Sequence, residues 1–576
     1  MTESAEQPGR CDLVAWWDAR PANYYDASPN LARVLDRWAG GAAREKVEPS
    51  LREFGAAVAT VVEPAVVVLE AHRELPAHVP FDGVGRRVER IEFHPAYETA
   101  GRAIWASGML AGSGDRPSPF ELTALFYLLS HCGEGGHACP VVCTAGAIRA
   151  LEHRGATELQ ERFLPGLHDR DYGSCLRASQ FLTEVQGGSD VGANAARAVP
   201  DAGTPGAWRV SGEKWFCSVA DADLFVVTAR PQGATTGTRG LGCFAIPRTL
   251  DGSTPNGFRI RRLKDKLGTR ALASAEIDFE DALGWPVGPI DQGFHVAVEE
   301  LLNTSRWLNA VGSTGIMRRA YLEASSFARH RQAFGRPVAS FPLVREQLAR
   351  MKAEEYAALS STMALAGLVA RIDDGTADET IAGAYRFLVN ANKYVTSVCA
   401  TDVARQGIEV LGGNGTIEDF SPLPRLYRDA MVYESWEGTH NVLAAQVLRD
   451  CARSDILDRT MAWVRAQLEH AGTFGPDTAT VEAALGATAS RLWSSVEAAG
   501  SAGPDAAPHF RRQLEAFVRC VQAACLLTEV AAEGAGTDKA PATALFVRLH
   551  VSPGHEPADD LEWAGLVEGT LGGDAG

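Results

Sequence analysis

The chain has 576 residues, of which 46% are apolar and 22% charged, and its formal net charge at pH 7 is −17. This length predicts about three or four domains, and the composition is that of an ordinary globular protein and not of a disordered one. The acidic balance disfavours general binding to nucleic acids, which would need a local basic patch.

No run of about 18 apolar residues is present, so we expect no transmembrane helix and no membrane partner. The N-terminus, Met1 to Glu6, has neither the basic nor the apolar region of a signal peptide. The eleven cysteines are scattered and form no CxxC pair. We therefore expect a cytoplasmic protein whose thiols are reduced and mostly buried.

Residues 1–178 show helical periodicity with few strand signals, so the sequence predicts an N-terminal helical domain here. The clearest apolar stripes are at 51–69 and 119–129. A cluster of Gly, Ser and Pro at 112–117 predicts a turn between two of the helices.

Between residues 179 and 290 the pattern changes to short β-branched and aromatic runs separated by Gly, Pro, Asp and Asn. The runs at 208–210, 224–228 and 243–246 are examples. Such closely spaced short strands predict a β-barrel or sandwich domain. The segment 231–240 predicts an exposed hairpin loop within it.

Helical periodicity returns at 291–450, with long stretches at 307–332 and 343–370, and predicts a helical bundle domain. Residues 451–576 are rich in Ala and predict an extra C-terminal helical domain. The predicted fold class is therefore mainly α with a central β-domain, in the order helical, β-barrel, helical bundle and helical extension.

Three motifs follow one another along the β and bundle segments, namely LTEVQGGSD at 182–190, RQAFG at 331–335 and YESWEGTHN at 433–441. Each alone could arise by chance. In this order and at these separations they resemble the acyl-CoA dehydrogenase family of flavoproteins. The resemblance covers residues 120–450, approximately, and implies that family's fold, with FAD lying between the β-domain and the second helical domain.

The resemblance assigns the cofactor contacts of the β-domain. The Thr183 hydroxyl would hydrogen-bond the flavin ring and Ser189 would meet the phosphates, while the glycines let the backbone approach the cofactor closely. Phe216 stands where an aromatic residue packs on the flavin, and Ser218 stands near flavin N5. Taken alone, these segments could be a Gly-rich turn and a plain strand. The implied cofactor-binding residues here are Leu182, Thr183, Gly188, Ser189, Phe216 and Ser218.

In the second helical domain the resemblance implies contacts with the cofactor of a neighbouring subunit. Arg331 would pair with its pyrophosphate, a group that suits the forked donors of a guanidinium. The glycines that follow Glu409, where Gln is usual, would touch its adenosine half. We therefore expect a homodimer or homotetramer. The implied residues are Arg331, Phe334, Glu409, Gly412, Gly413, Thr439 and Asn441.

Glu437 is the candidate catalytic base. The resemblance implies that it takes the α-proton of an acyl thioester while a hydride leaves the β-carbon for flavin N5. That proton is only weakly acidic, so desolvation of Glu437 against Trp436 and the substrate would raise its pKa toward neutrality. Glu434, three residues earlier, competes for the role. Arg306 stands where the family has an Arg near the CoA part of the substrate, although a lone Arg is more often a surface ion pair.

The long N-terminal region and the extension after residue 450 are similar to the AidB-like branch of the family. That branch has been linked to alkylated DNA and has a basic C-terminal domain. In this chain, residues 451–576 hold nine Lys and Arg against seventeen Asp and Glu. Because nucleic-acid binding needs local positive charge, a nucleic-acid partner is not expected.

The predicted function is thus FAD-dependent α,β-dehydrogenation of an acyl thioester, with an electron-transfer flavoprotein as the acceptor that the family implies. Two alternatives stay open. One is an oxygen-using hydroxylase or oxidase on the same scaffold, and the other is an AidB-like DNA-protecting flavoprotein.

A cluster of soft side chains raises the question of a metal site. Two of its cysteines fall on one side of an apolar helix with a proline between them, and buried thiols are common. We therefore expect no metal, although the residue types suit one. The cluster consists of His131, Cys132, His137, Cys139 and Cys143.

Overall fold

The computed structural model describes residues 7–111, 118–250, 252, 254–472, 475–503, 507–534, 536–552 and 560–572. The turn predicted at 112–117 lies outside these residues. The chain forms two compact units. The first unit comprises Met1–Thr60, Ser118–Gly133 and Asn309–Gly576, and the second comprises Val61–Pro117 and Glu134–Leu308.

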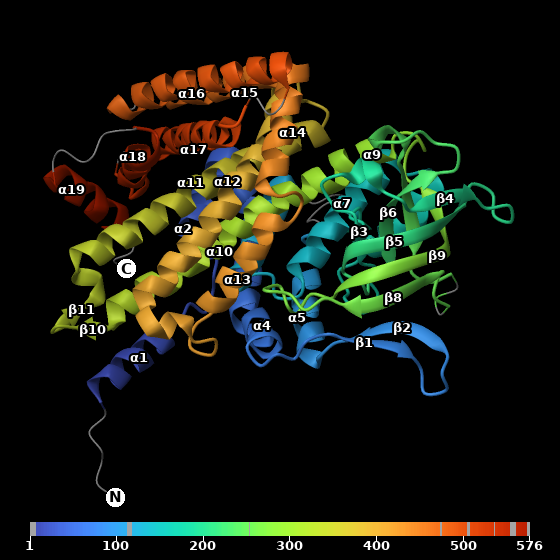
Figure 1. Ribbon diagram of the computed structural model, residues 1–576. Helices are drawn as coiled ribbons and strands as arrows, with labels where there is room; N and C mark the ends of the chain where they lie inside the picture. The colour runs from blue at the N-terminus through green and yellow to red at the C-terminus, as the bar shows by residue number, and fades with distance from the viewer. Residues whose placement is uncertain are drawn as a thin grey trace, which may run out of the picture. The chain divides into compact units, whose positions relative to one another are not determined.

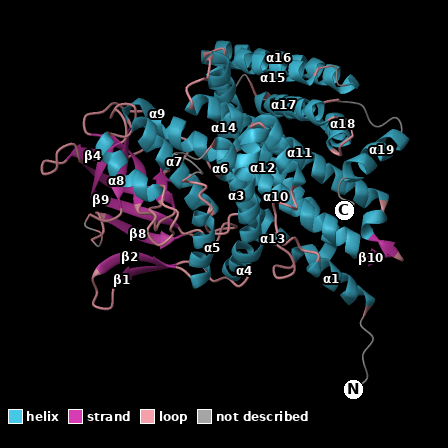
Figure 2. Cartoon of the chain, turned by 180° about the vertical axis from the view of Figure 1, so that it is seen from behind, coloured by secondary structure: helices cyan, strands magenta, loops and turns pink. Residues whose placement is uncertain are grey.

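The first unit is built from helices (Figures 1 and 2). Its longest helices include α10, α11 and α12. α13, α14, α15 and α17 pack on α12, and α17, α18 and α19 pack on α11. The helices are α1 (Pro8–Asp18), α2 (Pro29–Trp38), α3 (Gly41–Ala57), α6 (Pro119–Leu129), α10 (Asn303–His330, which begins in the second unit), α11 (Pro342–Asp373), α12 (Glu379–Leu411), α13 (Leu423–Ser435), α14 (His440–Arg453), α15 (Ile456–Ala471), α16 (Gly475–Ala502), α17 (Phe510–Glu533), α18 (Lys539–His550) and α19 (Asp560–Leu571).

Local signals start and end the long helices. α11 begins at Pro342, because the fixed φ of proline suits a first helical turn. At the start of α12 the Asp378 carboxylate accepts a hydrogen bond from the Ile381 N–H at 2.9 Å. α12 ends at Leu411 and is capped by Gly412, whose φ of 63° lies in the left-handed region that favours glycine. The 3₁₀ turn Gly412–Thr416 follows, so the predicted cofactor glycines stand at a helix end.

The C-terminal extension belongs to the core of the first unit. α17 packs against α11, α12, α15, α16 and α18. Its buried face includes Leu514, Phe517, Val518 and Val521. Burying each such side chain stabilises a fold by about 1.5–3 kcal/mol, so the extension is held by a substantial apolar contact.

The second unit contains a closed sheet (Figure 1). β6 pairs with β4 and also with β7, and the path β4–β5–β9–β7 completes a ring of paired strands. β3 joins β6 in parallel, and β8 pairs with β9. A ring of pairings without free edges is the arrangement of a barrel. The strands are β3 (Ala178–Phe181), β4 (Arg197–Pro200), β5 (Trp208–Ser218), β6 (Leu224–Pro231), β7 (Gly242–Pro247), β8 (Phe258–Leu263) and β9 (Ser274–Pro286).

The predicted fold class, mainly α with a central β-domain, is confirmed. The strand runs expected at 208–210, 224–228 and 243–246 fall within β5, β6 and β7, and the exposed segment at 231–240 joins β6 to its antiparallel partner β7. The remaining helices of the second unit are α4 (Glu63–Glu70), α5 (Pro95–Ala106), α7 (Ala138–Arg154), α8 (Thr157–Leu167) and α9 (Gly293–Val296).

One feature differs from the helical pattern expected before residue 178. β1 (Ala77–Phe81) and β2 (Arg87–Glu92) form an antiparallel hairpin. The Asp82 carboxylate stabilises its turn by accepting the N–H groups of Val84 and Arg86, each at 2.9 Å. Glu89 is fully buried and accepts the Ile260 N–H of β8 at 2.9 Å, which fixes the hairpin to the sheet.

The boundaries predicted for four domains, 1–178, 179–290, 291–450 and 451–576, stay predictions, and the first of these segments contributes to both units. Among the described residues, no helix combines the length and the hydropathy that crossing a membrane requires.

Candidate functional site

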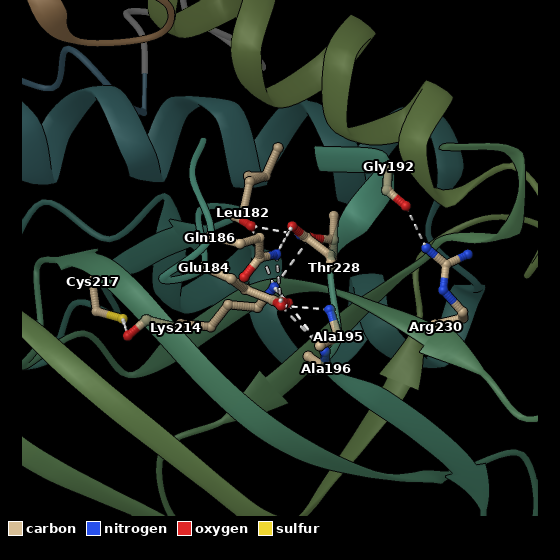
Figure 3. A network of polar contacts seen from close by, with 11 residues as sticks. Leu182, Glu184, Gln186, Gly192, Ala195, Ala196, Lys214, Cys217, Thr228 and Arg230 are labelled. Atoms are coloured by element: carbon tan, nitrogen blue, oxygen red, sulfur yellow. Dashed lines mark hydrogen bonds and ion pairs between the residues drawn. The ribbon is translucent and has the colours of Figure 1, made fainter. Parts of the chain in front are cut away.

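The loop that leaves β3 carries the first motif, and a buried ion pair fixes it (Figure 3). Lys214 Nζ on β5 lies 2.7 Å from Glu184 Oε1, and the two side chains are 0% and 3% exposed. The Glu184 carboxylate also accepts the N–H groups of Ala195 and Ala196, at 2.5 and 3.2 Å. Lys214 Nζ donates a second bond to the Leu182 carbonyl at 3.3 Å. The ion pair therefore ties the start of the motif to β5 and to residues 195 and 196, which follow the motif.

The electrostatics of this pair follow from its burial. Burial disfavours the charged form of Glu184, but the charge and the hydrogen bond of Lys214 outweigh it and hold the pKa of the carboxyl below its usual value. Burial lowers the pKa of Lys214, which the carboxylate only partly offsets. Two such groups tolerate the loss of water only while they stay paired.

Thr183 and Gly188 face each other across the same loop. A Cβ at Gly188 would lie 2.7 Å from Thr183 Oγ1. The Thr183 side chain is half-buried, and Gly188 and Ser189 are exposed. The loop therefore presents a hydroxyl and bare backbone to its surroundings, as the approach of a ligand requires.

Gly188→Ala is expected to weaken FAD binding, because the added methyl group collides with the stiff β-branched Thr183 and displaces the loop at a cost of about 1–3 kcal/mol. Fluorescence titration of the apoprotein with FAD measures the effect. Gly83→Ala is the matched control, since a Cβ there would meet nothing within 4 Å. Equal FAD affinity in the two variants would contradict a close approach at Gly188.

Phe216 and Ser218 lie on β5. Phe216 is 54% exposed, which is unusual for a large aromatic side chain, and the Lys264 ammonium lies 4.9 Å from its ring. Ser218 Oγ is 3.0 Å from Ser274 Oγ on β9, and Lys266 Nζ donates to Ser274 Oγ at 3.0 Å. Ser274 and Lys266 were not predicted, because only the pairing of β5 with β9 brings Ser274 to Ser218, and Lys266 joins them through Ser274.

Glu437 lies in the turn between α13 and α14 and has a φ of 57°. Non-glycine residues seldom adopt this left-handed conformation, and when they do the surrounding structure holds them there. Lys393 of α12, a fully buried lysine, donates to the carbonyls of Glu434 at 2.9 Å and Gly438 at 3.1 Å. The turn is thus held from both sides of Glu437, while Trp436 stacks on Tyr433 with ring centroids 4.8 Å apart.

Glu434, the competing carboxylate, has two side-chain partners. His440 Nε2 lies 2.8 Å from its carboxylate, and the Thr401 hydroxyl donates to it as well. Burial disfavours the charged form of Glu434, but these two hydrogen bonds outweigh burial and hold the pKa of the carboxyl below its usual value. A carboxylate with a lowered pKa and two fixed partners is a poor proton acceptor.

The remaining predicted residues of the first unit lie on helix ends and a hairpin. Thr439 precedes α14, and Asn441 in its first turn accepts a hydrogen bond from Arg511 at 3.1 Å. Glu409 pairs with Arg405 at 3.5 Å near the end of α12, and the exposed Gly412 and Gly413 follow.

Arg331 and Phe334 belong to the hairpin of β10 (Gln332–Ala333) and β11 (Arg336–Pro337). Arg331 donates to the Gly9 carbonyl at 3.1 Å and lies 3.6 Å from the Asp12 carboxylate of α1. Phe334 at the tip is 96% exposed. By contrast Arg306, on α10 in the second unit, is only 3% exposed and donates to Asn303 Oδ1 at 3.3 Å, so it is not a surface side chain.

The five side chains that suggested a metal site have other contacts. In the second unit, His137 Nε2 donates to the Tyr97 carbonyl at 2.8 Å, and Cys139 Sγ lies 3.7 Å from Cys143 Sγ. In the first unit, His131 Nε2 lies 3.2 Å from Ser28 Oγ. The described residues contain no group of three or more His, Cys, Asp or Glu side chains placed to hold a metal ion. The absence of a metal stays a prediction.

His137 is expected to make the second unit less stable in acid. Burial lowers the pKa of His137 to about 4, whereas a histidine in the unfolded chain has a pKa of about 6.5. The free energy of unfolding should therefore fall by up to about 3 kcal/mol between neutral pH and pH 4. Denaturant unfolding at several pH values tests this against His137→Gln, which keeps a donor for the Tyr97 carbonyl. A parallel pH dependence in both proteins would contradict it.

Comparison with known proteins identifies the domains. The acyl-CoA dehydrogenase middle domain matches residues 179–282, and the acyl-CoA dehydrogenase C-terminal domain matches residues 291–451. The N-terminal domain of the adaptive response protein AidB matches residues 18–174. The putative acyl-CoA dehydrogenase AidB of Escherichia coli K12 is 34% identical over 407 residues, which cover 68% of this chain and 73% of that protein. The chain belongs to the acyl-CoA dehydrogenase family.

A second relative and two solved structures are similar over most of this chain. Acyl-CoA dehydrogenase family member 11 of Caenorhabditis elegans is 32% identical over 446 residues, or 74% of this chain and 70% of that protein. The crystal structure of C. elegans ACDH-11 in complex with C11-CoA has a TM-score of 0.84 and 27% identity, and it covers 94% of this chain and 92% of that one. The apo-form of Bd2924 has a TM-score of 0.78 and 28% identity, and the match covers 88% of this chain and 98% of that one.

The chain is accordingly an FAD-dependent, acyl-CoA dehydrogenase-like oxidoreductase. The expected resemblance to the AidB-like part of the acyl-CoA dehydrogenase family is confirmed.

Proposed function

We propose that this protein removes two hydrogens from the α and β carbons of an acyl-CoA thioester, with Glu437 as the base. The observation that carries the proposal is the left-handed conformation of Glu437 on a turn held by the buried Lys393. Strain of this kind costs about 1–3 kcal/mol and is concentrated at functional sites. The competing carboxylate, Glu434, is occupied by His440 and Thr401.

Each residue of the turn has a separate task in this proposal. Glu437 takes the α-proton onto its carboxylate, and the neighbouring Trp436 is held by stacking on Tyr433. Lys393 holds the turn carbonyls, so the carboxylate keeps its position while its charge changes. FAD, when bound, supplies the acceptor for the β-hydrogen.

The residues of the second unit fit FAD. Phe216 offers an aromatic face that is half exposed, and planar rings stack on such faces. Thr183 and Ser218 offer half-buried hydroxyls, and Gly188 leaves room for close approach. We assign Leu182, Thr183, Gly188, Ser189, Phe216 and Ser218 to the cofactor from this unit.

The first unit supplies contacts to the cofactor of a second copy of the chain in this proposal. The hairpin that carries Phe334 projects an aromatic side chain that is 96% exposed, and aromatic side chains are enriched where two proteins meet. We therefore propose a homodimer or homotetramer, and keep the cytoplasm as its predicted compartment. The residues that we assign are Arg331, Phe334, Glu409, Gly412, Gly413, Thr439 and Asn441.

An acyl-CoA is the proposed substrate, because a C. elegans relative was solved with C11-CoA. Arg306 is assigned to the CoA part, and its burial means that it acts from within the protein. An electron-transfer flavoprotein is the proposed acceptor of the electrons.

The DNA-protecting alternative has less support, because two of the three arginines of α17 have partners within the first unit. Arg511 donates to Asn441, and Arg519 pairs with Glu354 at 2.7 Å with only 11% of its side chain exposed. A guanidinium as buried as that of Arg519 cannot release counterions from DNA phosphates.

Product analysis tests the proposed function. Mass spectrometry of anaerobic and aerobic reactions should show a 2-enoyl thioester, two hydrogens lighter than the substrate, in both. An oxygenated product that forms only in air would replace the proposal with the oxygen-using alternative.

A further inference from the structure

One face of α17 carries three polar residues at four-residue spacing, Arg511, Glu515 and Arg519, and each has a partner on another helix of the first unit. Arg511 donates from Nη1 to Asn441 Oδ1 at 3.1 Å. Arg519 donates from Nη1 to Glu354 Oε2 at 2.7 Å and from Nη2 to Cys399 Sγ at 3.1 Å. Residues four apart share one face of a helix, so this face is a contact surface of the C-terminal extension.

Tyr394 of α12 joins Arg511 and Glu515 of this face. Arg511 Nε donates to the Tyr394 hydroxyl at 3.1 Å, and the hydroxyl donates to Glu515 Oε2 at 3.0 Å. The Arg511 guanidinium also lies 5.1 Å from the centre of the tyrosine ring. The hydroxyl thus has a donor and an acceptor one helical turn apart on α17, which fixes its position.

The same tyrosine touches the turn that carries the proposed base. Its ring centre lies 4.9 Å from that of His440, and His440 holds the Glu434 carboxylate at 2.8 Å. The neighbouring residue on α12 is Lys393, which holds the carbonyls on both sides of Glu437. Two adjacent residues of α12 therefore brace residues 434–440, and α17 fixes one of them.

Arg511 also determines which atom of the Asn441 amide is available to a ligand. Its guanidinium occupies Oδ1, so the Nδ2 group of Asn441 is left as a donor for another ligand. An acceptor-rich cofactor suits that donor. The guanidinium donates to two groups at once, which a lysine ammonium cannot do with the same fork geometry.

We propose that the C-terminal extension completes the functional site, with Arg511 and Glu515 as positioning residues for Asn441 and for the turn of Glu437. The proposal rests on the proposed function, in which Asn441 contacts FAD and Glu437 takes the proton. It gives the acidic extension a task within the enzyme in place of nucleic-acid binding.

Arg511→Met in the full-length protein tests the proposal. We expect the dissociation constant for FAD to rise by about tenfold. This corresponds to losing one hydrogen bond of a charged group, here the bond from Arg511 to Asn441. The pKa of the base, read from the pH profile of kcat, should also shift, because the turn of Glu437 loses a brace. Arg512→Met is the matched control, since Arg512 is the exposed next residue on the same helix. FAD affinity and a pH profile that match those of Arg512→Met would overturn the proposal.

Tyr394→Phe gives a second route if Arg511→Met does not fold, because it removes only the hydroxyl that Arg511 and Glu515 bind. It should shift the pH profile of kcat in the same direction as Arg511→Met does. The change in FAD affinity should be smaller, because Arg511 keeps its hydrogen bond to Asn441. An unchanged pH profile in this variant would contradict the proposal that Tyr394, held by α17, positions the turn of Glu437.

The FAD titration separates this proposal from the proposed function. If the wild-type protein oxidised no acyl thioester, the effect of Arg511→Met on FAD affinity would still be measured. If dehydrogenation were confirmed and Arg511→Met bound FAD as the wild type does, only the proposed role of the C-terminal extension would be contradicted.

Discussion

Glu437→Gln is expected to abolish most of the dehydrogenation while leaving FAD and substrate bound. Glutamine has nearly the same shape and cannot accept the α-proton, so kcat/KM should fall by about 10²–10⁴-fold, the usual contribution of a general base. The left-handed φ of 57° should be retained, because Lys393 holds the carbonyls of Glu434 and Gly438 on both sides of Glu437. Steady-state rates with an artificial electron acceptor measure the loss, and the visible spectrum of the bound flavin shows that the site is intact.

Glu434→Gln is the comparison that makes this result specific. Its carboxylate is bound by His440 and Thr401, so its replacement should disturb the turn and lower the rate by a smaller factor. A large loss in Glu434→Gln together with near-normal activity in Glu437→Gln would assign the base to Glu434 and contradict the proposal.

Lys214→Met is expected to destabilise the second unit by about 3–5 kcal/mol, because it leaves the buried Glu184 carboxylate without its counter-charge. The same change should release the first motif, since Glu184 also holds Ala195 and Ala196, and FAD affinity should fall with it. Denaturant unfolding followed by tryptophan fluorescence measures the first effect, and FAD titration measures the second.

Arg259→Met is the matched control for the ion pair. Arg259 lies on β8 and pairs with Glu280, but each of these side chains is 50% exposed. Exposed pairs contribute about 0–1 kcal/mol, so this variant should unfold almost as the wild type does. Equal destabilisation by Lys214→Met and Arg259→Met would contradict the claim that burial makes the loss of the Glu184–Lys214 pair costly.

Local patterns predicted the strands and long helices well. β6 and β7 appear as runs of β-branched and aromatic residues, and both are fully or almost fully buried, which is what such runs favour. The hairpin of β1 and β2 was missed because its strands are short and rich in charged residues. Its only local signal was the Asp82-Gly83 turn.

The motifs indicated where the site residues lie in the chain, but their partners could not be predicted. Lys393 is 41 and 45 residues from the two carbonyls that it holds, and Arg511 is 70 residues from Asn441. Such contacts depend on how helices pack and leave no periodic pattern in the sequence. The arginines of α17 illustrate the point, because their spacing alone does not tell whether they face DNA or the bundle.

The most direct test of the central claim is an anaerobic titration of the FAD-loaded protein with saturated acyl-CoA thioesters of increasing chain length. We predict that at least one thioester bleaches the visible flavin band of the wild-type protein and is converted to its 2-enoyl form. In Glu437→Gln, the same thioester should bind and shift the band without bleaching it. Bleaching that is undiminished in Glu437→Gln, or no bleaching of the wild type by any thioester, would contradict the assignment of Glu437 as the base of an acyl-CoA dehydrogenation.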